Sequence, residues 1–178
     1  MAIIIVGGSG KSVGKTSLVC GLIAALPKIR WTAVKVTSHD YGRLELVWEE
    51  TEAGQGTDTA RYLAAGAQRA LLVTLRDDAL PIDEIWKAVG RGTELIFESN
   101  AIAGQLEADL CLGVVGAGAK VKPSFEPFMR RMDAAVVVSG ARAFAGSDAA
   151  MPVFRLEDLE RISPEMLGWV RERLRVAG

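Results

Sequence analysis

The amino-acid sequence predicts an α/β protein with a mostly parallel sheet of about seven strands between two layers of helices. Strand-like and helix-like segments alternate along the chain, which is the order that parallel strands with crossover helices require. The strand segments are nearly continuous apolar runs, typical of strands buried on both faces. A glycine-rich segment joins the first predicted strand to the first predicted helix.

Each element has a local signal. The first predicted helix stops before Pro27, the third has Pro81 near its start, and Ser163 precedes a proline and a glutamate that open the last. The predicted strands are residues 2–6, 31–37, 70–75, 93–98, 109–115, 134–138 and 153–155. The predicted helices are residues 15–26, 57–65, 81–89, 124–132 and a C-terminal helix that opens at 163.

Composition limits the classes of function. The chain has 178 residues, of which 49% are hydrophobic and 24% charged, so we expect one soluble globular domain over residues 1–178. The net charge of −1 gives no electrostatic reason to expect nucleic acid or an anionic membrane as partner. No signal peptide or membrane-length apolar run is visible. Cys20 and Cys111 lie among apolar residues, which predicts packed thiols and a cytoplasmic location.

Residues 38–56 are polar and are predicted to be an irregular loop. The segment holds an acidic run around Glu49 and Glu50, and the flexible Gly54 and Gly56. It starts at the ligand-bearing end of a predicted strand. We therefore expect it to be mobile without ligand and more ordered with a bound nucleoside triphosphate.

The glycine-rich segment has the strand, loop and helix order of a phosphate-binding loop, so the fold class is specified as a P-loop NTPase-type three-layer αβα architecture. Lys15 can reach the outer phosphates and the Thr16 hydroxyl can hold Mg²⁺. Ser9 stands where the usual pattern has glycine, so either the loop is one residue longer or serine is tolerated there. The alternative is an ordinary glycine-rich turn. The residues predicted to bind nucleotide are Gly10, Lys11, Ser12, Val13, Gly14, Lys15, Thr16 and Ser17.

Other chemistry-bearing residues lie near the ends of predicted strands or at the start of the next helix, at the edge where open α/β sheets bind ligands. Glu98 ends an apolar predicted strand, which is where P-loop proteins place the acidic residue that holds or orients Mg²⁺. The alternative is that Glu98 caps the next helix or faces solvent. Lys35 offers a second cation to an outer phosphate or an acceptor, or pairs with a carboxylate. Asp58 is a metal ligand or an ordinary helix-start carboxylate. His39 and Asp40 orient water or an acceptor, or are structural. The predicted catalytic residues are Lys15, Lys35 and Glu98.

One set of residues resembles the molybdopterin-guanine dinucleotide biosynthesis protein B family. The motifs are Lys35 followed by His39-Asp40, then Gly56-Thr-Asp58-Thr-Ala-Arg61, then Ala65-Gly66-Ala67. The resemblance covers residues 2–100, and beyond them only the order of elements matches. It implies a homodimeric, Mg²⁺-dependent, GTP-binding P-loop protein with weak GTPase activity. It also implies a partner, the guanylyltransferase that attaches GMP to molybdopterin.

The chain also resembles dethiobiotin synthetase and its amidoligase relatives. They share the ending Val13-Gly14-Lys15-Thr16 and residues placed as Gly8, Lys35, Asp58 and Glu98 are. This resemblance implies that Thr16, Asp58 and Glu98 hold Mg²⁺. Both families tend to have glycine after the glutamate, where Ser99-Asn100 stands here. No Asn-Lys-x-Asp motif follows the strand at 134–138, so the choice of GTP over ATP rests on resemblance.

Three functions follow from these patterns. The first is a GTP-binding accessory protein of molybdenum cofactor synthesis. The second is an ATP-dependent small-molecule kinase or ligase that acts on an acceptor near Lys35. The third is a non-catalytic, nucleotide-dependent binding module.

Overall fold

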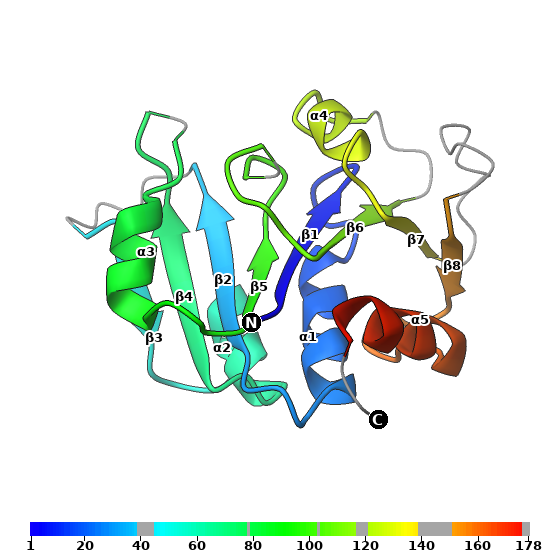
Figure 1. Cartoon of the computed structure of the whole chain (residues 1–178), viewed down its shortest axis with the longest axis horizontal. Helices are drawn as coiled ribbons and strands as arrows, with labels where there is room; N and C mark the ends of the chain where they lie inside the picture. Colours follow the sequence, from blue (N-terminus) through cyan, green and yellow to red (C-terminus); the bar gives the residue numbers. More distant parts are fainter. Residues whose placement is uncertain (39–44, 78, 103, 117–120, 139–150, 176–178) are drawn as a thin grey trace.

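The computed structural model describes residues 1–178 except 39–44, 78, 103, 117–120, 139–150 and 176–178. It confirms the predicted α/β class, with one sheet of eight strands (Figure 1). The strands are β1 (Ile3–Gly8), β2 (Thr32–Thr37), β3 (Val47–Glu50), β4 (Arg69–Thr74), β5 (Leu95–Glu98), β6 (Leu110–Val115), β7 (Ala134–Val138) and β8 (Val153–Leu156). The helices are α1 (Lys15–Ala25), α2 (Asp58–Ala64), α3 (Ile82–Val89), α4 (Phe125–Met129) and α5 (Pro164–Leu174).

The strand order is β3-β4-β2-β5-β1-β6-β7-β8, and every neighbouring pair is parallel except β3 with β4. β1 lies between β5 and β6, so that Ile4 is in register with Ile96 on one side and Leu110 on the other. The carboxyl ends of β1, β2, β4 and β5 point toward the top of Figure 1. Ligands of open α/β sheets bind at this end.

Two apolar cores cover the two faces of the sheet, which makes the three predicted layers. On one face Leu22 of α1, Tyr62 of α2 and Val170 of α5 pack against inner strand residues such as Ile4. On the other face Ile85 of α3 and, separately, Phe125 and Phe128 of α4 belong to a second core, together with strand residues such as Ile5 and Phe97. The central strands are therefore buried on both faces, as their continuous apolar runs predicted.

The prediction of an irregular segment over 38–56 is wrong at Val47–Glu50, which forms the antiparallel edge strand β3 and raises the strand number to eight. Its acidic residues have partners: Arg69 forms hydrogen bonds of 2.7 and 2.6 Å to the two carboxylate oxygens of Glu49. The Thr57 and Thr59 hydroxyls donate to Glu50. The two glutamates of β3 thus contact Arg69 of β4 and the threonines at the start of α2.

Helix caps agree with the sequence. The Thr57 hydroxyl accepts from the Ala60 N–H at the start of α2, and the Ser163 hydroxyl accepts from the Met166 N–H at the start of α5. α4 is shorter than the predicted 124–132 and ends at Met129.

Cys20 and Cys111 are free, buried thiols, and burial raises the pKa of each to about 11. Within the part of the chain that the structure describes, no helix has the length and apolar character needed to cross a membrane.

Candidate functional site

The loop predicted to bind phosphate, named the phosphate loop here, occupies residues 9–14 between β1 and α1, at the carboxyl end of the sheet. Gly14 has a φ of 98°, and a Cβ at this position would lie 2.1 Å from Leu159 Cδ1, so only glycine fits. No side chain caps the start of α1. Its first backbone N–H groups and its positive dipole end therefore remain able to bind an anion.

Ser9 shows why serine is accepted at the position where the usual motif has glycine. Its side chain is buried, with the residue 2% exposed, and its hydroxyl accepts from the Gly116 N–H at 3.1 Å. Its backbone N–H donates to the Val114 carbonyl at 2.9 Å, and its carbonyl accepts from the Lys122 N–H at 2.9 Å. Ser9 thus fixes the start of the phosphate loop to the end of β6.

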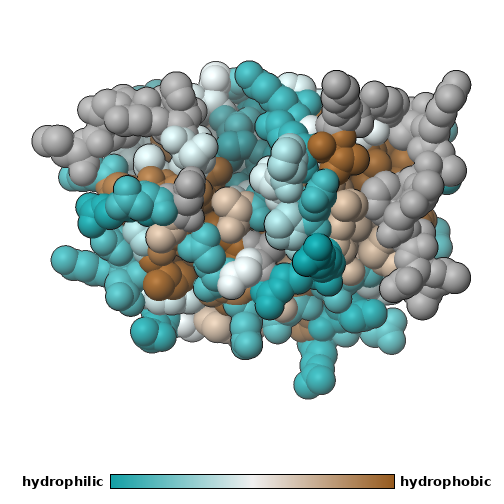
Figure 2. Space-filling view, turned by 90° about the horizontal axis from the view of Figure 1, so that it is seen from above, coloured by the Kyte–Doolittle hydropathy of each residue, from teal (hydrophilic) through white to brown (hydrophobic). Residues whose placement is uncertain are grey.

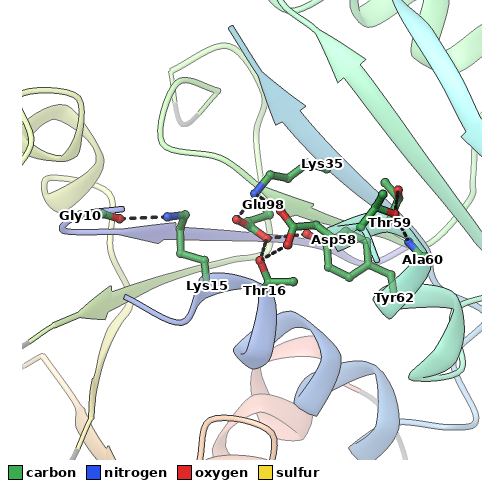
Figure 3. A network of polar contacts seen from close by, with 10 residues as sticks. Gly10, Lys15, Thr16, Lys35, Asp58, Thr59, Ala60, Tyr62 and Glu98 are labelled. Carbon is green, nitrogen blue, oxygen red and sulfur yellow. Dashed lines mark hydrogen bonds and ion pairs between the residues drawn. The ribbon is translucent and has the colours of Figure 1, made fainter. Parts of the chain in front are cut away.

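Four of the predicted site residues meet in one polar network (Figure 3). The Thr16 hydroxyl lies 3.0 Å from Asp58 Oδ1 and 2.7 Å from Glu98 Oε2. Lys35 Nζ lies 2.9 Å from Asp58 Oδ2 and also contacts Glu98 Oε1. One oxygen of each carboxylate therefore faces the threonine and the other faces the lysine. Of the two interpretations of Lys35 that the sequence allows, the one in which it pairs with a carboxylate matches these contacts.

Glu98 is 2% exposed, and each of its two carboxylate oxygens has at least one hydrogen-bond donor. The Tyr62 hydroxyl donates to Glu98 Oε2 at 2.5 Å, in addition to the contacts from Thr16 and Lys35. A buried carboxylate without such partners would be costly. Tyr62 is entirely buried in α2, so the sheet, α1 and α2 together set the orientation of Glu98.

The charges of the network shift several pKa values. Burial alone would raise the pKa of Asp58, but the hydrogen bond and charge of Lys35 outweigh it and lower that pKa. Burial would lower the pKa of Lys35, but Glu98 and Asp58 outweigh it and raise it. Burial, with the nearby charges of Lys35 and Lys122, lowers the pKa of Lys15. Burial and Glu98 raise the pKa of Tyr62 well above its usual value.

A cavity of about 720 Å³ opens beside the phosphate loop. Lys11, Lys15, Lys35 and Glu98 line it, and Lys15 Nζ lies 3.1 Å from the Gly10 carbonyl. The cavity continues over the ends of β2, β4 and β5, where its lining includes Val36, Thr37, Ser38, Leu75, Ser99, Asn100 and Ala101. Figure 2 views this end of the sheet from above, with hydrophilic side chains gathered across its centre.

Sequence reasoning missed the structural roles of three residues. Tyr62 lies in a segment for which the sequence predicts only a helix, yet its hydroxyl contacts Glu98. Asn100 accepts from the Gly8 N–H at 2.7 Å and donates to the Gly8 carbonyl at 3.0 Å, so it fixes the strand that leads into the phosphate loop. Lys122 lines the cavity from a distant segment. These residues are far along the chain from the groups they contact, so no motif spacing could indicate their roles. His39 and Asp40 lie outside the described residues.

The donor set suits Mg²⁺. Among the described residues, no group of three or more His, Cys, Asp and Glu side chains could hold a metal ion. Thr16, Asp58 and Glu98 instead offer a hydroxyl and two carboxylates, which are hard oxygen donors. Mg²⁺ in phosphate-binding sites uses one or two carboxylates together with substrate phosphates and water. These residues therefore fit a magnesium ion that is shared with a phosphate.

Comparisons with known proteins show the fold. No family model matches the sequence, and no curated protein matches it. HypB from Helicobacter pylori, solved with nickel, has a TM-score of 0.60 at 15% identity, over 98% of this chain and 87% of that one. LpxK from Aquifex aeolicus, solved with ATP, has a TM-score of 0.55 at 20% identity over 87% of this chain, which spans only 53% of LpxK.

A MobB protein homolog from Bacillus stearothermophilus has a TM-score of 0.52 at 19% identity, over 98% of this chain and 99% of that one. Together with the strand order and the loop between β1 and α1, these likenesses define a P-loop NTPase-type fold. At such identities the likeness concerns the fold alone.

Proposed function

We propose that this protein binds a nucleoside triphosphate with Mg²⁺ and hydrolyses it slowly. The observation that carries this proposal is the Thr16 hydroxyl, which lies at the start of α1 within hydrogen-bond distance of both Asp58 and Glu98. A hydroxyl after the loop lysine and a carboxylate at a strand end are the parts that P-loop proteins use to hold Mg²⁺ beside a phosphate.

The residues of the site have separate roles in binding the phosphates and Mg²⁺. The loop N–H groups and the N-terminus of α1 bind the phosphates, and Lys15 turns from the Gly10 carbonyl toward the outer ones. Thr16, Asp58 and Glu98 would hold Mg²⁺, which when bound neutralises phosphate charge. Lys35 contacts both carboxylates on the oxygens that Thr16 does not contact, and its positive charge limits the repulsion between them.

For the biological role, we propose a GTP-binding accessory protein of molybdopterin guanine dinucleotide synthesis, acting in the cytoplasm as a single-domain homodimer with a guanylyltransferase. Two observations support it: the motifs at Lys35 and over residues 56–67, and the fold likeness to the MobB homolog across 98% of this chain. GTP, rather than ATP, is proposed on this resemblance alone.

Hydrolysis assays test the proposed site. Glu98→Gln and Asp58→Asn keep the side-chain shapes and remove the charges, so Mg²⁺-dependent turnover should fall by about tenfold or more, with a smaller loss of nucleotide binding. Asp83→Asn on the exposed face of α3 is the matched control and should keep full turnover. Unchanged turnover in both site variants would remove these carboxylates from the metal site.

The cavity supports a second candidate, an ATP-dependent kinase or ligase. It extends past the lysines to Val36, Ser38 and Leu75, which leaves room for an acceptor beside the phosphates. Phosphate release that depends on an added metabolite would favour this candidate. Very slow turnover together with guanylyltransferase binding favours the cofactor role, and nucleotide binding without turnover favours a non-catalytic module.

A further inference from the structure

We infer that Lys122 is a further phosphate-binding residue, which reaches the outermost phosphate of the nucleotide from the segment that follows β6. The inference rests on the proposed function and adds a source of selectivity for triphosphate over diphosphate. Lys122 is 107 residues away from Lys15 in the sequence, yet both line the same cavity.

Backbone contacts hold Lys122 next to the phosphate loop. Its N–H donates to the Ser9 carbonyl at 2.9 Å, and its carbonyl accepts from the Phe125 N–H at 2.8 Å. Two residues further on, the Ser124 hydroxyl lies 3.3 Å from the Asn100 side-chain nitrogen. The same Asn100 binds Gly8, so the segment around Lys122 and the phosphate loop share one anchor.

The packing of α4 against the sheet fixes the position of the segment that contains Lys122. Phe125 and Phe128 are fully buried, and their rings are stacked with centroids 5.7 Å apart. A Cβ at Gly7 would lie 2.7 Å from the Phe128 ring, so α4 packs directly on the strand that enters the phosphate loop (Figure 1). A lysine on such a support can bind an anion with little loss of backbone freedom.

Charge indicates what Lys122 binds. Among the described residues, Lys122 has no carboxylate within ion-pair distance, whereas Lys35 contacts two. Lys15 and Lys122 line the same cavity, so two positively charged side chains border the space beside the phosphate loop. Two cations that disfavour each other across a cavity are stabilised by an anion placed between them.

The position of Lys15 identifies the phosphate. The loop lysine of P-loop proteins reaches the outer phosphates, and Lys122 lines the same cavity as this lysine. A triphosphate carries one more negative charge than a diphosphate, and Lys122 supplies one more positive charge. We therefore expect Lys122 to contribute mainly to triphosphate binding.

Calorimetric titration with Mg²⁺ tests the inference on wild type, Lys122→Gln, Lys122→Arg and the control Lys87→Gln on α3. The ligands are a non-hydrolysable GTP analogue, a non-hydrolysable ATP analogue, GDP and ADP. Lys122→Gln should bind the better triphosphate analogue about tenfold more weakly and its diphosphate less than about twofold more weakly. Lys122→Arg and Lys87→Gln should stay close to wild type, and circular dichroism checks that each variant is folded.

Equal affinity of wild type and Lys122→Gln for the triphosphate overturns the inference and leaves the proposed function intact. Equal losses for triphosphate and diphosphate also overturn it, because Lys122 would then act on an inner phosphate or on the loop itself. If wild type binds no nucleotide at all, both the proposed function and the inference fail. If Lys122→Gln does not fold, Lys122→Ala takes its place: weaker binding confined to the triphosphate supports the inference, and unchanged triphosphate affinity overturns it.

Discussion

Lys35 contacts the two carboxylates of the candidate metal site on the side away from Thr16. Asp58 Oδ2 and Glu98 Oε1 face the lysine, while Asp58 Oδ1 and Glu98 Oε2 face the threonine. A cation that binds next to Thr16 therefore need not displace Lys35. The lysine instead limits the repulsion between two carboxylates that would otherwise share a partly buried site.

Lys35→Met should lower the free energy of unfolding by about 2 kcal/mol, less than for a fully buried pair because Asp58 is partly exposed. The lowered pKa of Asp58 means that its contribution is present above its ordinary pKa and is lost as pH falls through the lowered one. The raised pKa of Lys35 means that its contribution is present below its ordinary pKa and is lost as pH rises through the raised one.

Urea unfolding of wild type and Lys35→Met across pH measures this difference. It should be largest between about pH 5 and pH 9 and should shrink outside that range. Arg69→Met removes the exposed pair with Glu49 and is the control, with an expected cost below about 1 kcal/mol. A Lys35→Met difference that does not change with pH would contradict the assigned charge pair.

Tyr62→Phe removes one hydroxyl from the network and leaves the ring in place. Glu98 Oε2 then loses the donor at 2.5 Å and keeps Thr16, so the free energy of unfolding should fall by about 1 to 2 kcal/mol. Because Glu98 is then less firmly oriented, Mg²⁺-dependent triphosphate binding should also weaken. Chemical denaturation and a Mg²⁺ titration in the presence of triphosphate measure the two effects. A variant as stable as wild type would show that the hydroxyl contributes nothing to the buried site.

Among the strands, β3 is the one whose formation depends on tertiary contacts more than on its own residues. The central strands have apolar runs that predict them directly, whereas Val47–Glu50 contains two adjacent glutamates. These glutamates suit a strand only because Arg69 of β4 and the threonines at the start of α2 lie beside them. Such partners are distant in sequence, so an edge strand of this kind resembles a loop.

Hydrogen exchange tests the edge strand and the segment around it. Val47–Glu50 pairs with β4 on one side only, so those of its amides that face β4 should exchange slowly both with and without a non-hydrolysable triphosphate. Residues 51–53, which belong to no strand or helix, provide the internal comparison and should exchange faster. We also expect the rest of residues 38–56 to become more ordered when a triphosphate binds. Fast exchange of the amides that face β4 in the free protein would contradict a stable β3.

At the scale of the whole molecule, the sheet order explains why the site could be predicted in part. β2, β5 and β1 are neighbours, so Lys35, Glu98 and the phosphate loop meet at one end of the sheet. The sequence placed each of these residues at a strand end, and strand ends of a parallel sheet share one edge. Tyr62, Asn100 and Lys122 lie on helices or connections, where position depends on packing that the sequence pattern alone does not determine.

The most direct test of the account is the melting temperature with GTP, ATP, GDP and ADP, each with and without Mg²⁺, for wild type, Lys15→Ala and the control Lys87→Ala. A triphosphate at about 100 times its dissociation constant should add roughly 2.7 kcal/mol of stability, which raises the melting temperature of a chain of this size by about 5 to 10 °C. Wild type and Lys87→Ala should show this rise with Mg²⁺ and a triphosphate, and Lys15→Ala should lose most of it. Nucleotide binding at the phosphate loop is contradicted if no nucleotide stabilises the wild type, or if Lys15→Ala keeps the full increase.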